Sequence, residues 1–321
     1  PFFLMIRRPP RSTLFPYTTL FRSMVDFAFP HRYSNFVSLA TALTLSRIQA
    51  QASLVEQVVK DHVKYGASSS SRSTLTPAFF VNVYPFESKL LAVRAFAKKS
   101  FRMPTFNDLY YADMGNSKLN PESALQYDLG FVLNKDWKQG IVDHLRLQVD
   151  GYYNTVYDKI VAYPKGQQFR WTMLNLGKVH IKGVDAMAEV GLEPAKDWKV
   201  TARLQYTYQD ARDVTDPNTS YYKDQIPYIP WHSGSAILGL SWRELDLAYS
   251  FIYSGERYSQ QENILYNHLQ PWYTHDMSVV YHARRWSARL DVNNIFSQDY
   301  DVILNYPMPK RNYMLTLEYN F

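Results

Sequence analysis

The sequence predicts a transmembrane antiparallel β-barrel, and three observations lead to that prediction. Segments along most of the 321-residue chain alternate apolar and polar residues with a period of two. The connections between these segments alternate between tight turns and long loops. Tyrosine, which favours membrane interfaces, occurs 26 times. Because lipid admits only helices and closed barrels, strands with one apolar and one polar face indicate a barrel.

The carboxy-terminal segment, residues 311–321, shows the clearest alternation. Its polar face carries Thr316, Glu318 and Asn320. Its other face carries five residues that we expect to point toward lipid: Tyr313, Leu315, Leu317, Tyr319 and Phe321. This segment is therefore predicted to be a membrane-spanning strand that ends the chain on its apolar face.

Twelve further segments repeat the pattern, so the chain predicts about thirteen strands of roughly ten residues, enough to cross a bilayer when tilted. The strong copies lie at 124–133, 144–150, 199–208, 245–253 and 286–292. Weaker copies lie near 34–45, 48–60, 74–84, 90–99, 180–192, 233–242 and 272–282.

The connections predict which end of the barrel faces outward. Outer-membrane barrels have short periplasmic turns and long outer loops. If residue 321 ends at the periplasm, every tight turn falls on the periplasmic side. The predicted tight turns are 46–47, 85–88, 193–197, 243–244 and 283–284. The predicted outer loops are 61–73, 101–121, 156–178, 212–231, 255–271 and 295–310.

A soluble β-sandwich is the main alternative fold, since its strands also alternate. The strands here are too long and too numerous for one sandwich, and aromatic residues cluster near the strand ends. The sequence has no apolar run of about twenty residues, so no transmembrane helix is expected. It has no cysteine, which excludes disulfides and thiolate metal sites.

Residues 2–23 do not follow the strand pattern. They contain four arginines, three prolines and no acidic residue, and they resemble the translation of a synthetic sequencing adapter. We therefore expect 1–23 to be a non-native segment and 24–321 to be the folded domain. Without those arginines the chain has 31 basic and 29 acidic residues, which removes the support for nucleic-acid binding.

Several strings, found in the same order, resemble the carboxy-terminal half of a TonB-dependent outer-membrane receptor. The clearest is the segment 101–110, which contains Phe-Arg-Met-Pro. The others are Gly115-Asn116, the segment 119–122, the segment 175–177, the segment 181–184, the segment 292–296 and the terminal Phe321. The resemblance covers roughly residues 34–321.

The resemblance implies a 22-stranded barrel in a Gram-negative outer membrane, with an amino-terminal plug in its lumen. Such a receptor imports a scarce chelate with energy delivered through TonB. Thirteen strands, an odd number, would then be an incomplete barrel, because bacterial barrels close with even numbers. The stretch 306–313 favours cobalamin, an iron siderophore is equally compatible, and the absence of histidine between 102 and 122 argues against haem.

The predicted outer loops hold the candidate ligand-binding residues, because aromatic and polar side chains there could stack on or hydrogen-bond a flat chelate. The alternative is that these loops pack on themselves. The candidates are Asp108, Tyr110, Tyr111, Trp171, Tyr221, Tyr222, Arg257 and Tyr258.

No metal, cofactor or catalytic site is predicted. The eight histidines are scattered, and the acidic segment 210–216 lacks the glycine that a calcium loop usually needs. No catalytic motif is present, so we expect no enzyme. A passive porin is the main functional alternative, and a barrel enzyme is a weaker one. The lumen charges are expected to pair with one another and with the plug: Arg146, Asp150, Arg203, Arg289, Asp291 and Glu318.

Overall fold

The computed structural model describes residues 28–69, 71–111, 114–164 and 171–320. The predicted non-native segment 2–23 and Phe321 lie outside these ranges. No helix within the described ranges is long and apolar enough to span a membrane.

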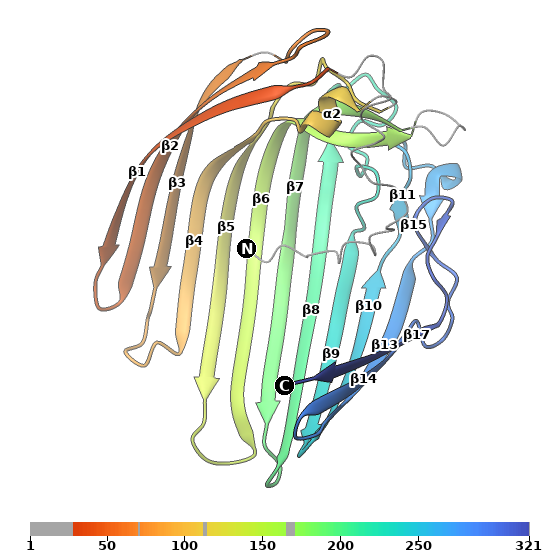
Figure 1. The fold of residues 1–321 in the computed structure, drawn as a ribbon. Helices are drawn as coiled ribbons and strands as arrows, with labels where there is room; N and C mark the ends of the chain where they lie inside the picture. Colours follow the sequence, from red (N-terminus) through yellow and green to blue (C-terminus); the bar gives the residue numbers. More distant parts are fainter. Residues whose placement is uncertain (1–27, 70, 112–113, 165–170, 321) are drawn as a thin grey trace.

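One curved, 13-stranded antiparallel sheet makes up most of the structure (Figure 1). Each strand of this sheet pairs with the strand of the same sheet that follows it in the sequence. The strands, in sheet order, are β1 (His31–Thr44), β2 (Ile48–His62), β3 (Arg72–Val83), β4 (Leu91–Arg102), β5 (Glu122–Asp136), β6 (Val142–Pro164), β7 (Trp171–Leu192), β8 (Trp198–Asp213), β9 (His232–Trp242), β10 (Leu245–Ser254), β13 (Trp272–His282), β14 (Trp286–Asn293) and β17 (Asn312–Tyr319). All thirteen predicted strands are therefore present.

The short turns lie at one end of the sheet and the long loops at the other, as predicted; we call these the turn end and the loop end (Figure 1). The loops carry helix α2 (Phe106–Tyr110), the 3₁₀ turn η1 (Leu265–Asn267) and two small ribbons. The ribbons pair β11 (Arg257–Tyr258) with β12 (His268–Leu269), and β15 (Asp301–Ile303) with β16 (Tyr306–Pro307).

One loop prediction is wrong. Residues 156–178 were expected to form a long loop, but β6 and β7 remain paired through this region, as far as Pro164 opposite Trp171. Their length of 23 and 22 residues carries the hairpin beyond the other strands. Tyrosine, isoleucine and valine in 157–163 favour a strand, but Asp158 and Lys159 hide the alternation.

The strand register keeps the predicted apolar faces together. On β10, Tyr249 lies opposite Leu238 of β9 and Met277 of β13, so all three side chains share one face of the sheet. Ser250 lies opposite Ile237 and Asp276 on the other face. Because lumen-facing and lipid-facing residues alternate, the first face is the membrane face and the second lines the lumen.

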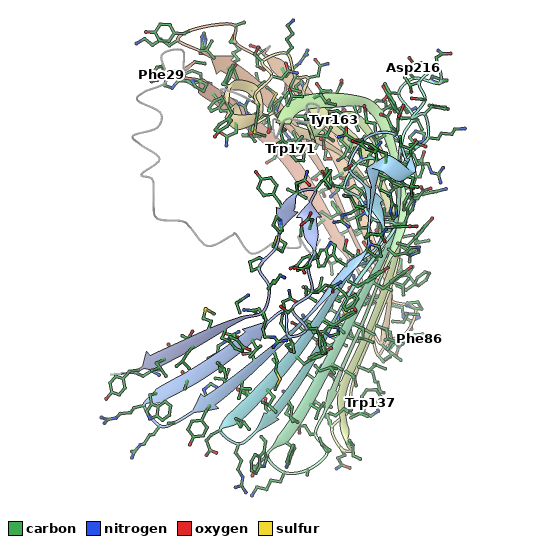
Figure 2. All side chains as sticks on the ribbon, turned by 90° about the vertical axis from the view of Figure 1, so that its right-hand side faces the viewer. Phe29, Phe86, Trp137, Tyr163, Trp171 and Asp216 are labelled. Carbon is green, nitrogen blue, oxygen red and sulfur yellow. The ribbon has the colours of Figure 1, made fainter. Side chains whose placement is uncertain are left out.

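Aromatic residues mark the two edges of the membrane band. Trp198 and Trp242 stack at the turn end with ring centroids 5.5 Å apart. Tyr208 lies ten residues further along the same face of β8. At about 3.4 Å per residue and a tilt near 45°, that span covers about 24 Å along the membrane normal, close to the apolar band of outer-membrane barrels. Figure 2 shows Trp137 toward the turn end and Trp171 at the loop end.

Ion pairs form at four of the six charges predicted for the lumen face, but the buried Nε atom of Arg146 has no hydrogen-bond partner within the described residues. Arg94 binds Asp150 with an N–O distance of 2.6 Å, and Gln148 donates to the same carboxylate at 2.8 Å. The pair fits only because residue 130 is glycine: a Cβ there would lie 1.9 Å from the Asp150 Oδ1 atom. The polar lining of the lumen is therefore closely packed around Asp150. The other predicted lumen charges that pair are Arg203 with Glu189 and Arg289 with Asp291.

Candidate functional site

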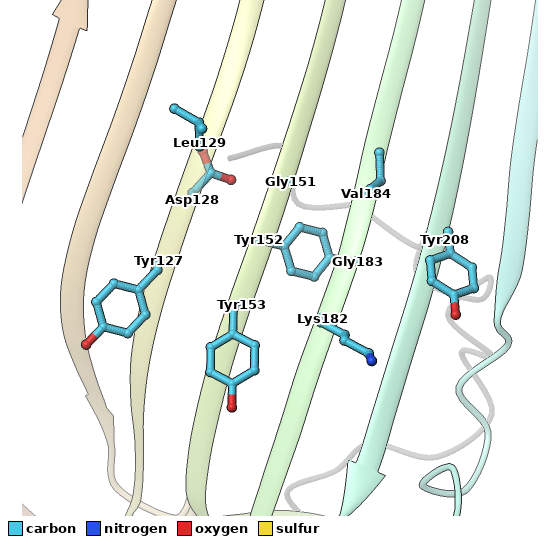
Figure 3. Close-up of a pocket in the computed structure, with 10 residues that line it drawn as sticks. All are labelled: Tyr127, Asp128, Leu129, Gly151, Tyr152, Tyr153, Lys182, Gly183, Val184 and Tyr208. Atoms are coloured by element: carbon cyan, nitrogen blue, oxygen red, sulfur yellow. The ribbon is translucent and has the colours of Figure 1, made fainter.

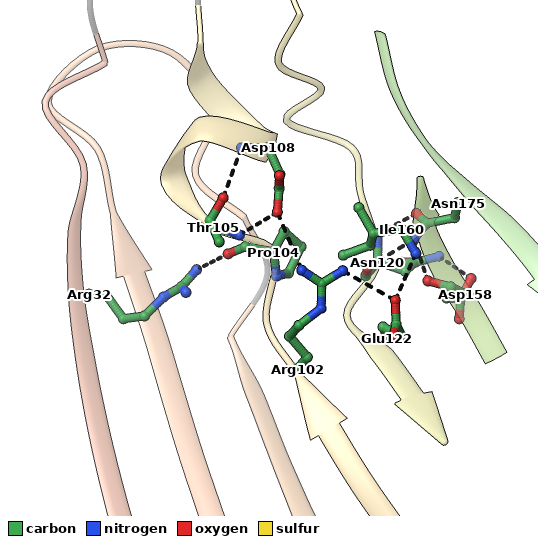
Figure 4. A network of polar contacts seen from close by, with 10 residues as sticks. All are labelled: Arg32, Arg102, Pro104, Thr105, Asp108, Asn120, Glu122, Asp158, Ile160 and Asn175. Atoms are coloured by element: carbon green, nitrogen blue, oxygen red, sulfur yellow. Dashed lines mark hydrogen bonds and ion pairs between the residues drawn. The ribbon is translucent and has the colours of Figure 1, made fainter. Parts of the chain in front are cut away.

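The loop 103–121 is fixed to its neighbours by the network drawn in Figure 4. Arg32 donates to the Pro104 carbonyl at 2.8 Å and also forms an ion pair with Asp61 at 2.7 Å. Arg102 binds Glu122 at 3.2 Å, and Glu122 accepts a hydrogen bond from the Ile160 amide at 2.9 Å. The loop itself is joined to β1 through Pro104, and through Asn120 to Asp158 of β6 at 3.2 Å and to Asn175 of β7 at 2.8 Å.

Asp108 caps helix α2. Its carboxylate accepts a hydrogen bond from the Thr105 amide at 2.8 Å, while the Thr105 hydroxyl accepts one from the Asp108 amide at 3.1 Å. This capping box satisfies two amides that the helix leaves without partners. Asp108 also lies 3.8 Å from Arg102. Both contacts are made by the Oδ2 atom, so in this structure Asp108 shapes the loop.

The two candidate tyrosines of this loop differ in their surroundings. Tyr110 packs against the buried Leu109 and Leu119, and its hydroxyl accepts a hydrogen bond from the Ser69 amide at 3.1 Å. Tyr111 leaves the helix and is 44% exposed. Tyr110 therefore joins two loops, and Tyr111 presents its ring to solvent.

Trp171 and Tyr258 belong to a chain of aromatic contacts across the loop end. Trp171 lies against Tyr228 with ring centroids 5.9 Å apart, and the Tyr228 amide donates to the Tyr258 carbonyl at 2.8 Å. Tyr258 in turn contacts Trp231 and His268, at 5.9 Å and 5.6 Å between centroids. Burial raises the pKa of Tyr228, so its phenol stays neutral. The loops that follow β8 and β10 thus pack on β7. Sequence reasoning missed Tyr228, Trp231 and His268.

Arg257 is buried, with 3% of its surface exposed. Its guanidinium donates to the carbonyls of Gln270, Asp301 and Val302, at 3.1, 2.5 and 3.3 Å. Arginine has five donors in a fixed plane, which suits it to join several carbonyls. We expected Arg257 to be a ligand donor, but in this structure it links the loop 255–271 to the β15–β16 ribbon.

Gln225 is fully buried at the centre of the loop 214–231. Its amide nitrogen donates to the carbonyls of Gln209 and Ile229, at 3.1 and 3.2 Å, and its oxygen accepts from the Ala211 amide at 2.8 Å. The candidates Tyr221 and Tyr222 lie half-buried on this framework. They therefore lie on a loop that the hydrogen bonds of Gln225 hold to β8.

The most exposed apolar residues of the loop end lie on η1. Leu265 is 90% exposed and Tyr266 is 85% exposed, next to Ile264 at 50%. Two asparagines fix their backbone: Asn263 donates to the Gln225 carbonyl at 3.0 Å, and Asn267 donates to the Glu262 carbonyl at 2.9 Å. The sequence signal was available, as an Ile-Leu-Tyr run inside a predicted outer loop, but it was not recognised.

The carboxylates of the acidic segment 210–216 have partners within the protein. Asp210 binds Arg212 at 2.7 Å, and the side chain of Asp213 accepts from the Thr215 amide at 2.9 Å. Asp216 accepts from the Asn218 amide at 2.9 Å. Within the described ranges, no group of three histidine, aspartate or glutamate residues is placed to hold a metal ion.

These features match one known family. The family described as "TonB dependent receptor-like, beta-barrel" matches residues 16–295, and the chain belongs to it. It is consequently part of an outer-membrane β-barrel, as predicted.

Solved structures show the same fold. The FrpB iron transporter of Neisseria meningitidis aligns with a TM-score of 0.66 and 16% identity, over 94% of this chain and 48% of its own. The ferric citrate transporter FecA aligns with a TM-score of 0.67 and 14% identity, over 90% of this chain and 45% of its own. The copper transporter OprC aligns with a TM-score of 0.65 and 17% identity, over 91% of this chain and 48% of its own. This chain thus spans about half the length of the solved structures that it matches.

Proposed function

We propose that residues 24–321 form the carboxy-terminal part of the barrel of a TonB-dependent importer, and that the loop end captures a scarce metal chelate. The observation that carries the proposal is the cross-linked set of loops at the outer end of a membrane sheet. Exposed aromatic side chains on loops that hydrogen bonds hold in place favour ligand capture over passive diffusion through a pore. The named neighbours transport iron, ferric citrate and copper, which supports a metal-bearing substrate for this chain.

The proposed capture surface consists of exposed and half-buried side chains of the loop end. Leu265, Tyr266 and Tyr111 offer apolar and aromatic area, and Tyr221 and Tyr222 add phenol groups. Rigid aromatic side chains lose little conformational entropy on binding, which makes them efficient contacts. A bulky, partly planar chelate, either a ferric siderophore or a cobalamin, has the chemistry that fits them. Five of the predicted ligand-binding residues instead hold the loops that carry these side chains: Asp108, Tyr110, Trp171, Arg257 and Tyr258.

Import after capture would require the partners that the family uses. We propose that an upstream plug domain closes the lumen and that TonB displaces it. The polar lumen lining, with Arg94 paired to Asp150, provides a surface on which such a plug can form hydrogen bonds.

Binding experiments with the complete native coding sequence test the function. We expect a ferric siderophore or cyanocobalamin to bind the purified receptor, and the double variant Leu265→Asn, Tyr266→Ser to weaken binding about tenfold, because both side chains lie at the surface proposed for the ligand. The matched control is Phe86→Ser, an exposed aromatic at the turn end. Isothermal titration calorimetry measures the chelate affinity of the wild-type protein, the double variant and the control.

Two other outcomes would contradict the proposal. If no chelate binds while sugars and ions cross reconstituted bilayers freely, the protein is a porin. If a chelate binds and the loop variant keeps the full affinity, the capture surface lies elsewhere.

Deleting residues 2–23 should leave expression, heat-modified gel mobility and chelate binding unchanged, because this segment has no strand pattern. A loss of membrane insertion in the shortened protein would show that the segment is native.

A further inference from the structure

A groove of about 500 Å³ lies along β6 on the membrane face of the sheet (Figure 3). Cross-strand pairing places Leu129, Gly151, Val184 and Tyr208 in one row on this face. The next row toward the loop end contains Tyr127, Tyr153 and Lys182. We call this hollow the β6 groove.

The groove exists because residue 151 has no side chain. Leu129 and Val184 stand on either side of Gly151 and form the walls, so the missing side chain leaves a gap in the apolar band. A Cβ at position 151 would have the Leu129 carbonyl oxygen as its nearest neighbour, at 3.9 Å. The gap is thus open space that a larger residue could fill without a clash, and a flexible apolar chain could occupy it.

Positive charge lies at the loop end of the groove. Lys182 lines it, and the side chain of this lysine is 64% exposed. Arg212 is nearby on β8, and one buried carboxylate, Asp210, serves both cations, at 3.4 Å from Lys182 and 2.7 Å from Arg212. Lys178 lies further along the same face of β7, over the Tyr157 ring. Three cations and one carboxylate leave a net positive charge just beyond the tyrosine row.

We propose that the β6 groove binds a phosphorylated lipid of the outer leaflet, with one acyl chain beside Gly151 and a phosphate oxygen at Lys182 and Arg212. The groove faces the hydrocarbon layer, so its occupant is apolar along most of its length. The cations lie where the tyrosines place the membrane interface, and anionic headgroups are attracted to lysine and arginine there. This site is separate from the chelate surface and rests only on the membrane placement of the sheet.

The test compares the wild-type complete receptor with its variants. The quantity measured is the lipid that each protein retains after extraction in mild detergent. Native mass spectrometry and phosphate and acyl-chain analysis of the same sample determine it. We expect about one phosphorylated lipid per protein. Gly151→Phe should remove it by filling the groove. Lys182→Ala should lower the occupancy about fivefold, which corresponds to the loss of one lysine at an anionic lipid surface.

Two control variants lie on the same face outside the groove. Val149→Phe enlarges the next outward residue of β6, and Lys135→Ala removes a lysine from the turn end of β5. Both should retain the lipid. Chelate affinity should be unchanged in all four variants, which separates this proposal from the proposed function.

Three results would overturn the lipid site. Gly151→Phe could retain as much lipid as the wild-type protein. Val149→Phe could lose the lipid equally, which would show only unspecific contact with the bilayer. The retained mass could also be inorganic phosphate without acyl chains, or a second copy of the protein.

Discussion

Replacing Leu238 with arginine is expected to destabilise the membrane-inserted barrel by about 2–4 kcal/mol, the cost of an arginine on the lipid face at the bilayer midplane. Leu238 points toward lipid between Ala202 and Tyr249. Leu238 lies midway along β9 between Trp242 at the turn end and Gly234 toward the loop end. Gly234 pairs with Tyr206 and Tyr253, so aromatic residues lie on both sides of Leu238 along the membrane normal. Its position therefore gives the charge the longest path to water from either interface. Unfolding titrations in lipid vesicles measure the change in free energy.

Ser250→Arg is the matched control. Ser250 faces the lumen, where the new cation can meet water and the carboxylate of Asp276. We expect a change well below that of Leu238→Arg. Equal destabilisation by the two variants would contradict the assignment of the two faces.

Arg257→Met should loosen the loop end. The substitution keeps much of the apolar stem but leaves the carbonyls of Gln270, Asp301 and Val302 without their donor. Each buried carbonyl that loses its partner costs about 1–3 kcal/mol. We expect the loops 255–271 and 294–311 to become sensitive to protease, while the membrane sheet stays intact. Limited proteolysis of the membrane-inserted protein, followed by mass spectrometry of the fragments, measures the effect.

Arg284→Met is the control for this experiment, because Arg284 is an exposed arginine in a short turn. It should leave the digestion pattern unchanged. If Arg257→Met resists protease as well as the control does, Arg257 does not hold the loops together. The prediction that its guanidinium binds the ligand would then stand again.

The membrane part of the fold could be predicted because each residue's own polarity indicates which face of the strand it occupies. A strand between lipid and lumen must alternate residue by residue, so Leu315 and Thr316 of β17 report their faces without knowledge of any partner. The register then follows from tight turns such as 243–244. The β6–β7 extension could not be predicted in this way. Above the membrane both faces of the hairpin meet protein or water, and the alternation disappears near Asp158, whose φ of 52° interrupts the regular strand.

The candidate site was predicted only as a region, because its contacts join residues far apart in the sequence. Nothing local to Arg257 indicates that it will meet the Asp301 carbonyl 44 residues away. Asp108 is different: the Thr-x-x-Asp spacing at 105–108 resembles a capping box, which sequence alone could have suggested. Leu265 and Tyr266 stand out in the sequence as part of an apolar run in a predicted loop, but only the fold of the loop shows that their side chains are exposed.

Cysteine labelling in intact cells tests most directly the claim that the loop end of an outer-membrane barrel faces outward. The chain contains no cysteine, so each introduced thiol reports a single position. We expect Tyr266→Cys to react with a membrane-impermeant maleimide in intact cells. We expect Arg284→Cys to react only after the outer membrane is permeabilised. Labelling of Arg284→Cys from outside, with Tyr266→Cys protected, would contradict this orientation.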